Sequence, residues 1–207
     1  MTRIIAIDTT GQFGSLALLE DQATVEELLL ESPDGFAHVL FPQLERLMQR
    51  HGWRPETVAG YVAAAGPGSF TGVRVGLAAV KGLAEATGAK AAAVSNLQAM
   101  ASYGSAPLRA PFCDARRGEI YGALYDSALS RHGHETVAPF PAWRAHLPAG
   151  AELLTPDPSI FQVEATPTPR ALAAAIGRLG AARLVDPVQL DANYVRRSDA
   201  ELNWTDR

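Results

Sequence analysis

Short apolar runs separated by glycines open the chain and predict a meander of strands. Residues 3–8 (RIIAID) form a β-branched run that ends in an acid, and Gly11 and Gly14 allow a tight turn into a second run at 15–19. Residues 24–30 (TVEELLL) fit a third strand, although their composition also suits a helix. The pattern therefore predicts a β-β-β unit at the N-terminus.

Two later segments have the spacing of amphipathic helices. In residues 36–50 the apolar side chains cover an arc wider than the roughly 100° that packing on one sheet requires. Residues 71–87 also carry apolar side chains on two sides, and Gly88 follows as a C-terminal stop. Apolar strands are predicted at 58–65 and 90–94, and a short helix follows the second of them. This order predicts an α/β fold with a mixed sheet.

The second half of the chain begins like the first. Residues 109–115 form a strand with Asp114 near its end, Gly118 allows a turn, and residues 119–125 return as another strand. Weaker patterns follow: strands at 135–140 and 152–154, a proline-rich loop at 155–169 and an alanine-rich helix at 169–180. The repetition predicts two related lobes, residues 1–104 and 105–207, of which the second is reduced.

Composition narrows the class of protein. The chain has 207 residues, of which 47% are hydrophobic and 19% charged, and this supports a sizeable core. Its net charge of −4 argues against nucleic-acid binding by this chain alone. Cys113 is the single cysteine, so no intrachain disulfide can form. The sequence shows neither a signal peptide nor a membrane-spanning run, and we expect a cytoplasmic protein.

The loop GPGSFTG at residues 66–72 is the most specific chemical motif. A glycine-rich loop between a strand and a helix can direct backbone N–H groups at a phosphate. The motif is not a Walker loop, and Thr71 stands where a G-x-G-x-x-G pattern needs its third glycine. Alternatively, the glycines let the helix pack close to the sheet, with Ser69 or Thr71 as its cap. Both interpretations remain open at this point.

Other candidate groups are less specific. Asp8-Thr-Thr, at the end of the first strand, is similar to the first phosphate loop of actin-like ATPases, but an aspartate also caps turns. The histidines lack metal-ligand spacing, and His132 and His134 fit an exposed loop. Cys113 fits a small buried apolar residue. The segment DARRGE at 114–119 fits either a functional cluster or a charged hairpin tip.

Taken together, the segments resemble the TsaB (YeaZ) family of bacterial tRNA threonylcarbamoyladenosine biosynthesis proteins. The matching stretches are IIAIDTT at 4–10, the helix around His38–Leu47 with Pro42, GPGSFTGVRVG at 66–76, AVSNLQAMA at 93–101, DARRGEIYGALYD at 114–126 and YVRRSDAE at 194–201. Residues 131–188 match no motif. The resemblance implies the actin-like (ASKHA) fold, with two RNase-H-like lobes and mixed sheets. It also implies a role in modifying adenosine 37 of tRNA.

The resemblance further implies a subunit without catalytic activity. The family's catalytic paralogue, TsaD, binds a metal through H-x-x-x-H, where this chain has Asn96 and Met100; asparagine and thioether are poor ligands for such an ion. We therefore expect no metal, no cofactor and no ATP binding by the isolated chain. What remains is a vestigial nucleotide loop, formed by Asp8, Thr9, Thr10, Gly66, Gly68 and Ser69.

The implied partners are TsaD, the small ATPase TsaE, and tRNA only through the complex. We expect the two broad helices to bind TsaD in a four-helix bundle, or a second copy of the chain when it is alone, unless the second lobe covers them. The interface residues would be Phe41, Leu44, Met48, Val73, Leu77, Val80 and Ala84. Leu44→Arg should then abolish pairing and leave the fold intact.

A polar set could contact tRNA or a partner: Asp114, Arg116, Arg117, Glu119 and Arg196, with Arg197 beside it. Two other functions remain possible from the residues. One is an actin-like ATPase or kinase that uses Asp8 and Asp114. The other is a peptidase, which the lack of a Ser/His or Cys/His constellation disfavours.

Overall fold

The strand pattern at the N-terminus produces a sheet that is buried on both faces. In β1 (Arg3–Asp8), Ile5 and Ile7 face one core while Ile4 and Ala6 face another, because successive side chains of a strand point to opposite sides. All four side chains are buried. The computed structural model describes residues 1–196 of the chain.

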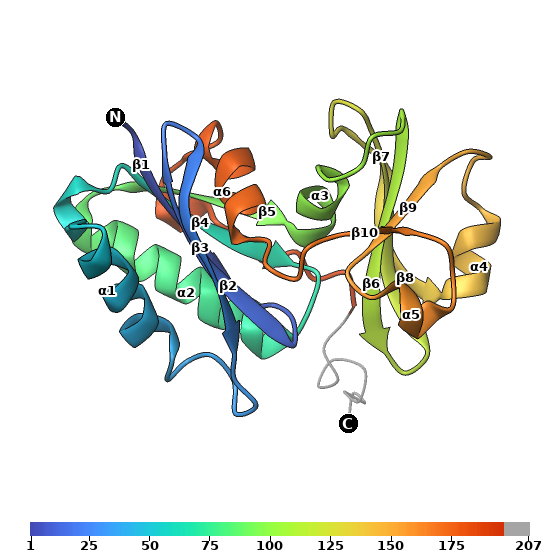
Figure 1. Cartoon of the computed structure of the whole chain (residues 1–207), viewed down its shortest axis with the longest axis horizontal. Coiled ribbons are helices and arrows are strands. Elements are labelled where there is room, and N and C mark those ends of the chain that lie inside the picture. Colours follow the sequence, from blue (N-terminus) through green and yellow to red (C-terminus); the bar gives the residue numbers. More distant parts are fainter. Residues whose placement is uncertain (197–207) are drawn as a thin grey trace, which may run out of the picture.

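The first sheet has the order β3-β2-β1-β4-β5 (Figure 1). Its strands are β1, β2 (Phe13–Glu20), β3 (Ala23–Glu31), β4 (Gly60–Gly66) and β5 (Lys90–Ser95). The first three are antiparallel, while β4 runs parallel to β1 and β5 parallel to β4. Residues 24–30 are thus a strand, and the mixed sheet that the sequence predicted is confirmed.

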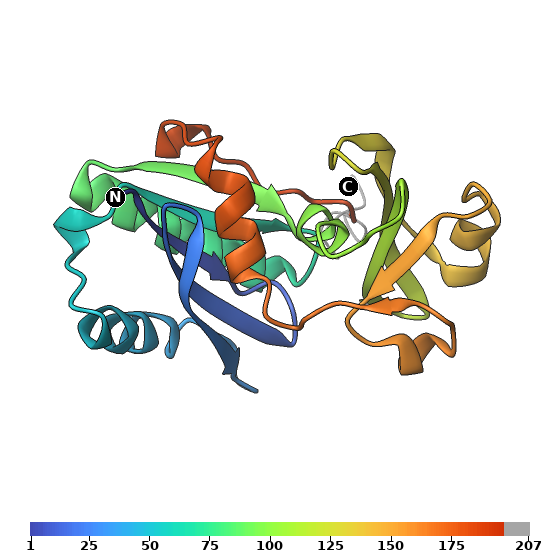
Figure 2. The same cartoon turned by 45° about the horizontal axis from the view of Figure 1, so that its top comes forward.

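Helices cover both faces of this sheet. The helices α1 (Leu40–Arg50) and α2 (Phe70–Thr87) pack on one face, in a core that contains Ile5 and Ile7. The helix α6 (Ala173–Ala181) crosses the other face, as Figure 2 shows. Ser69 caps α2, and Gly88 ends it in the left-handed conformation.

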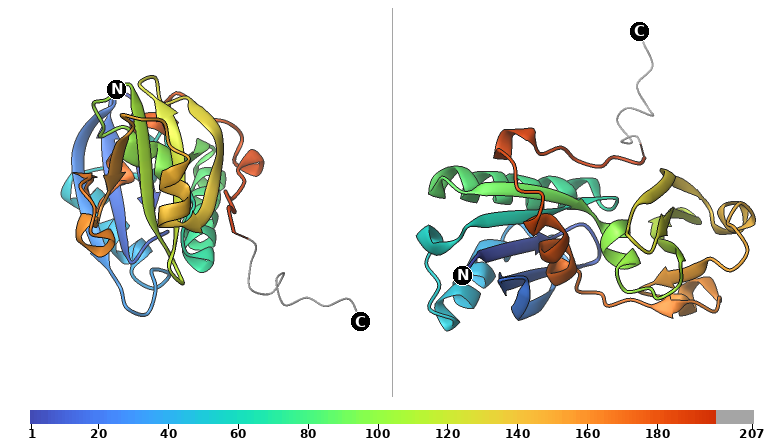
Figure 3. Two further views of the ribbon diagram at one scale, coloured as in Figure 1. Left: turned by 90° about the vertical axis from the view of Figure 1, so that its right-hand side faces the viewer. Right: turned by 90° about the horizontal axis from the view of Figure 1, so that it is seen from above.

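The second sheet repeats the topology of the first. Its order is β10-β9-β6-β7-β8. Its strands are β6 (Leu108–Arg116), β7 (Glu119–Asp126), β8 (Arg131–Pro139), β9 (Glu152–Thr155) and β10 (Thr166–Pro167). Again three antiparallel strands are followed by two parallel ones, but the last two are short. The two lobes lie side by side in Figure 3 and form the actin-like fold, with a reduced second lobe.

Short helices complete the described chain. They are α3 (Asn96–Ala101), α4 (Phe140–Ala145), α5 (Pro158–Phe161) and the single turns η1 (Pro55–Thr57) and η2 (Pro187–Gln189). The helix α3 lies between the lobes and packs on both, because Leu97 and Met100 belong to the core that also contains Tyr121 of β7. No helix within residues 1–196 is both long and apolar enough to span a bilayer.

The end of the chain does not follow the predicted division at residue 105. The helix α6 returns to the first lobe and lies very close to its sheet. A Cβ atom at Gly177 would stand 2.5 Å from Leu19 Cδ1, and one at Gly180 would stand 2.3 Å from Val62 Cγ1. A side chain at either position would displace its neighbours, so these glycines allow the close contact. The described part of the predicted second lobe, residues 105–196, is therefore not one lobe, because α6 packs on the first sheet.

Three further local differences separate the structure from the prediction. Residues 131–139 form an edge strand, so His132 and His134 lie exposed on a strand and not in a loop. The helix α4, which the sequence did not predict, is anchored where Trp143 covers Gly122, a position that leaves no room for a side chain. The predicted helix at 36–50 begins later, at Leu40.

Candidate functional site: the cleft between the lobes

A cleft of about 1190 Å³ opens where the two lobes face each other. Its walls include four segments that the sequence analysis singled out or left unexplained: the loop after β1, the GPGSFTG loop, the β6–β7 hairpin and residues 193–196. Residues 31–37 and parts of 156–172 also line it. The fold therefore brings both candidate phosphate loops to one place, together with the polar cluster of the second lobe.

Asp8 lies on the floor of this cleft and is 3% exposed. Its Oδ1 accepts hydrogen bonds from the backbone N–H of Thr10 (2.9 Å) and from its hydroxyl (2.7 Å), and its Oδ2 accepts one from Asn96 Nδ2 (3.2 Å). Burial raises the pKa of the Asp8 carboxyl, and the hydrogen bonds from Thr10 and Asn96 only partly oppose that effect. Both carboxylate oxygens are thus occupied by protein donors.

The raised pKa of Asp8 predicts a specific pH dependence of stability. The folded chain holds the proton at pH values where the unfolded chain has lost it, so this group makes the free energy of unfolding fall as pH rises above the ordinary value of 3.8. Asp8→Asn should remove that contribution. Urea unfolding of both proteins between pH 4 and about 8 measures the effect; two parallel pH profiles would contradict it.

The GPGSFTG loop packs directly on the loop after β1. A Cβ at Gly68 would stand 2.4 Å from the Thr10 carbonyl oxygen, and one at Gly72 would stand 2.0 Å from that of Thr9. The N–H of Ser69 donates to the Thr10 carbonyl (2.7 Å). Of the two interpretations left open by the sequence, the structure supports close packing, because these glycines accommodate the neighbouring backbone.

Asn96 ties the two loops together. Its Nδ2 donates to Thr10 Oγ1 (2.7 Å), and its Oδ1 accepts from the N–H of Gly66 (3.1 Å). Met100, one helical turn further along α3, is 1% exposed and belongs to the core. Within residues 1–196 no three His, Cys, Asp or Glu side chains are grouped so as to hold a metal ion.

The predicted polar cluster is assembled at the tip of the β6–β7 hairpin. Arg196 reaches it from the end of the described chain, where it donates to the Ala115 carbonyl (2.6 Å) and forms an ion pair with Glu119. The Arg116 N–H donates to Asp114 Oδ1 (2.7 Å). Arg116 and Arg117 both have positive φ angles (65° and 58°), a conformation that favours glycine or asparagine. Arg197 and the rest of YVRRSDAE lie outside the described residues.

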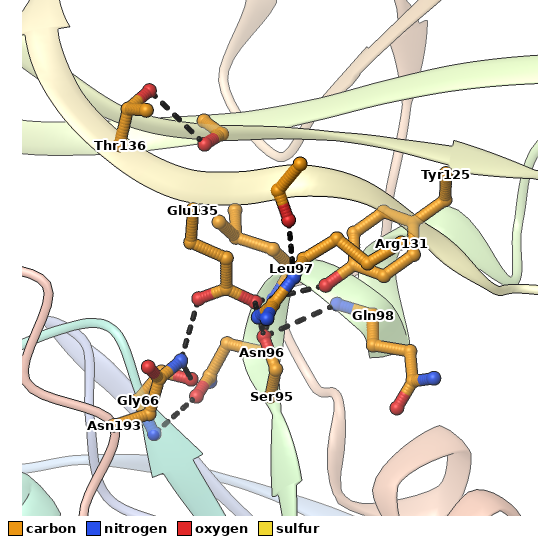
Figure 4. A network of polar contacts seen from close by, with 12 residues as sticks. Gly66, Ser95, Asn96, Leu97, Gln98, Tyr125, Arg131, Glu135, Thr136 and Asn193 are labelled. Carbon is orange, nitrogen blue, oxygen red and sulfur yellow. Dashed lines mark hydrogen bonds and ion pairs between the residues drawn. The ribbon is translucent and has the colours of Figure 1, made fainter.

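A second polar network connects the lobes, and the sequence analysis missed it (Figure 4). Glu135 of β8 has a side chain that is only 2% exposed. Its carboxylate accepts hydrogen bonds from Ser95 Oγ (2.6 Å), Tyr125 OH (2.8 Å) and Asn193 Nδ2 (2.5 Å). The three donors are far apart in the sequence, so no local pattern could have identified the group.

The predicted helical interface was largely wrong. Of its seven residues only Phe41 is exposed, at 50%, whereas Leu44 and Val80 are 3% and 0% exposed. The remaining members are also buried in the first-lobe core: Met48, Val73, Leu77 and Ala84. The physical reason is that the larger apolar face of each helix gains most by turning to the sheet. Leu44→Arg would therefore place a charge in the core.

The outward surface of the two helices is a different apolar face. A shallow groove of about 290 Å³ runs between α1 and α2, and only apolar side chains line it: Ala37, Leu40, Phe41, Val75, Ala78 and Ala79. Beyond it, Gly82 and Ala86 on α2 are exposed. Phe41 thus projects beside a smooth surface of small residues, which we call the α1–α2 groove.

Comparison with known proteins agrees with this architecture. Residues 33–139, more than half of the chain, match the family model of tRNA N6-adenosine threonylcarbamoyltransferase (TsaD). The chain is 34% identical over 124 residues to the tRNA threonylcarbamoyladenosine biosynthesis protein TsaB of Bacillus subtilis, a region that covers 59% of this chain and 54% of that protein. It is also 34% identical over 143 residues to TsaB of Escherichia coli, covering 66% and 61%.

A solved structure extends the similarity to nearly the whole chain. It is a Pseudomonas aeruginosa protein described as similar to peptidase YeaZ, with a TM-score of 0.78 and 26% identity, and the match covers 95% of this chain and all of the other. The chain spans between half and two thirds of the length of the Bacillus subtilis and Escherichia coli proteins that it matches. With the family model, these matches establish that the chain belongs to the TsaB (YeaZ) family.

Proposed function

We propose that this chain is a non-catalytic subunit in the biosynthesis of threonylcarbamoyladenosine in tRNA. In this role it pairs with a TsaD-like catalytic paralogue and helps to recruit a TsaE-like ATPase. The names of its relatives support the pathway, and the geometry of the cleft supports the non-catalytic role.

The observation that carries the non-catalytic role is the satisfied floor of the cleft. Asp8, Thr10 and Asn96 direct their polar groups at one another, and the glycine loop lies against neighbouring backbone. A nucleotide or metal would have to displace these contacts and then supply equivalent hydrogen bonds, since buried polar groups left unpaired are costly. This arrangement favours a structural use of both loops.

The α1–α2 groove supports the pairing. Phe41 is half exposed beside an apolar groove, and exposed aromatic side chains next to apolar surface are typical anchors of protein interfaces. The small residues of α2 would let a partner helix approach closely. The same groove is the surface by which two copies of the chain would associate when the catalytic partner is absent.

The hairpin cluster is proposed as a contact for the ATPase or for tRNA held by the complex. Two successive arginines keep the left-handed backbone conformation, which costs a non-glycine residue roughly 1 kcal/mol each. Such strain at an exposed tip supports a functional use of the side chains. With a net charge of −4, the chain leaves most of the basic surface for tRNA to its partners.

Reconstitution tests the proposal directly. TsaD, TsaE, threonylcarbamoyl-adenylate and tRNA are combined with and without this chain, and transfer of the threonylcarbamoyl group is measured. We expect at least about a tenfold higher rate with the chain, equivalent to about 1.4 kcal/mol of barrier. An equal rate without it would refute the role.

Calorimetry with ATP and Mg²⁺ separates this function from that of an ATPase or kinase. We expect no binding to the isolated chain, because Asp8 and the glycine loop are already occupied. Micromolar binding would favour the enzyme instead. For a peptidase, Cys113 is a poor candidate nucleophile, since burial raises the pKa of its thiol to about 12.

A further inference from the structure

Glu135 stands where the two lobes and the end of the described chain meet. Ser95 belongs to the first lobe, at the junction of β5 and α3, and Tyr125 belongs to β7 of the second. Asn193 belongs to the terminal segment. One carboxylate therefore joins three parts of the molecule (Figure 4).

The terminal segment itself spans both lobes. On the first lobe, the N–H of Asn193 donates to the Ala65 carbonyl (2.8 Å), and the Tyr194 ring stacks on Phe70 at 4.9 Å between centroids. On the second lobe, Arg196 binds the Ala115 carbonyl at the hairpin. Residues 193–196 thus cross the cleft mouth, and Asn193 is the residue that Glu135 holds.

Because Glu135 is buried, its carboxylate depends on hydrogen bonds from the protein. A buried carboxylate loses its hydration and needs replacement donors. Arg131 is the cation paired with it, at 3.7 Å and with a 42% exposed side chain, so the three hydrogen bonds supply most of the compensation. If the lobes moved apart, Ser95 and Asn193 would leave the carboxylate. Leaving the buried carboxylate without these donors costs free energy, and the cost grows as the lobes separate. The network therefore favours one arrangement of the lobes.

Apolar contacts through α3 also join the lobes, but they act differently. Leu97 and Met100 pack against both, and such contacts are non-directional. They tolerate small rotations that hydrogen bonds of 2.5 to 2.8 Å do not. The apolar core can keep the lobes together, while the carboxylate determines the angle between them.

We propose that Glu135, with Asn193, is a positioning pair that fixes the angle between the lobes and so sets the width of the cleft without any ligand in it. This inference concerns the isolated chain and does not depend on its role in tRNA modification. It predicts that loss of either side chain frees the lobes to rotate while each lobe stays folded.

The test measures the distance between the lobes by pulsed electron spin resonance. Spin labels are placed at Glu56→Cys on η1 and Ala145→Cys on α4, two exposed positions in different lobes. The native Cys113 is replaced by serine in every labelled chain, because it is a partly exposed free cysteine that lines the cleft. Singly labelled chains identify distances between molecules. We expect a narrow distance distribution in the doubly labelled parent.

The variants are Glu135→Ala and Asn193→Ala, and each should at least double the width of the distribution. Glu152→Ala is the matched control. Its carboxylate also accepts three hydrogen bonds, from Ser105, Ala106 and Thr166. Ser105 and Ala106 precede β6 and Thr166 belongs to β10, so none of the three donors belongs to the first sheet. We expect the parental width in this control.

Glu135→Gln keeps the shape of the side chain and can still accept from Ser95 and Tyr125. Its distribution should therefore lie between those of the parent and Glu135→Ala. Widths in Glu135→Ala and Asn193→Ala equal to that of the parent would overturn the proposal, as would equal broadening in Glu152→Ala. If Glu135→Ala does not fold, Asn193→Ala decides the outcome. Asn193 is only partly buried and lies outside both sheets, so truncating its side chain leaves the two sheets intact.

Discussion

Phe41→Arg should weaken binding of the TsaD-like partner by at least about 30-fold and leave the chain folded. Loss of an interface anchor costs about 2 kcal/mol or more, which corresponds to that factor. Phe41 is 50% exposed, so an arginine at this position reaches water in the isolated chain. In the complex the same charge would be desolvated against the apolar α1–α2 groove, without a partner in this chain's lining.

Affinity is measured by calorimetry, and folding by thermal unfolding. Gln49→Arg is the matched control: it adds the same charge to the exposed surface of α1, outside the groove, and should bind normally. Leu44→Arg serves as a second comparison. Leu44 is 3% exposed, so an arginine at this position should unfold the chain. Normal binding by Phe41→Arg would remove the groove from the interface.

Gly72→Ala should destabilise the chain by roughly 3 kcal/mol, at the upper end of the cost of overpacking. The new methyl group would stand 2.0 Å from the Thr9 carbonyl oxygen, which is backbone and cannot turn aside. The Gly72 carbonyl also accepts the Thr9 hydroxyl (2.7 Å), so any shift of α2 breaks that hydrogen bond. For a chain of this size the melting temperature should fall by on the order of 10 °C.

Gly82→Ala provides the control within the same helix. A Cβ at Gly82 meets nothing within 4 Å, and the residue is exposed in the middle of α2. Alanine should therefore stabilise the isolated chain by about 1 kcal/mol through helix propensity. Urea unfolding of both variants measures the difference. Equal effects at the two positions would mean that the packing of Gly72 on Thr9 does not limit stability.

The local pattern predicted most elements correctly, because short-range physics determines them. Short β-branched and apolar runs identified β1 and β2, and Gly88 marked the end of α2, since a left-handed residue there favours glycine. The two halves of the chain do form sheets of the same order. The weak pattern at 24–30 remained ambiguous, because an edge strand carries exposed charges as a surface helix does.

The predictions that failed concern the packing of helices: which face of a helix turns to the core, and on which sheet a helix packs. An amphipathic pattern gives the width of an apolar face but not the direction in which it points, so the buried face of α2 was mistaken for a partner surface. Likewise, the alanine-rich helix near the C-terminus carried no sign that it returns to the first sheet. Gly177 and Gly180 reveal this only through what lies opposite them.

By itself the sequence determined the family resemblance, the strand and helix segments and the pairing of two similar halves. It also identified the loop after the first strand, at 8–10, and the loop at 66–72, whose residue types suit either phosphate binding or close packing. Only the tertiary structure favours one of these uses, because it places Gly68 and Gly72 against the backbone of Thr10 and Thr9 and brings Asn96 to Asp8 from a distant segment. Which groups are satisfied, and therefore unavailable to a ligand, is a property of contacts between segments that no local pattern contains.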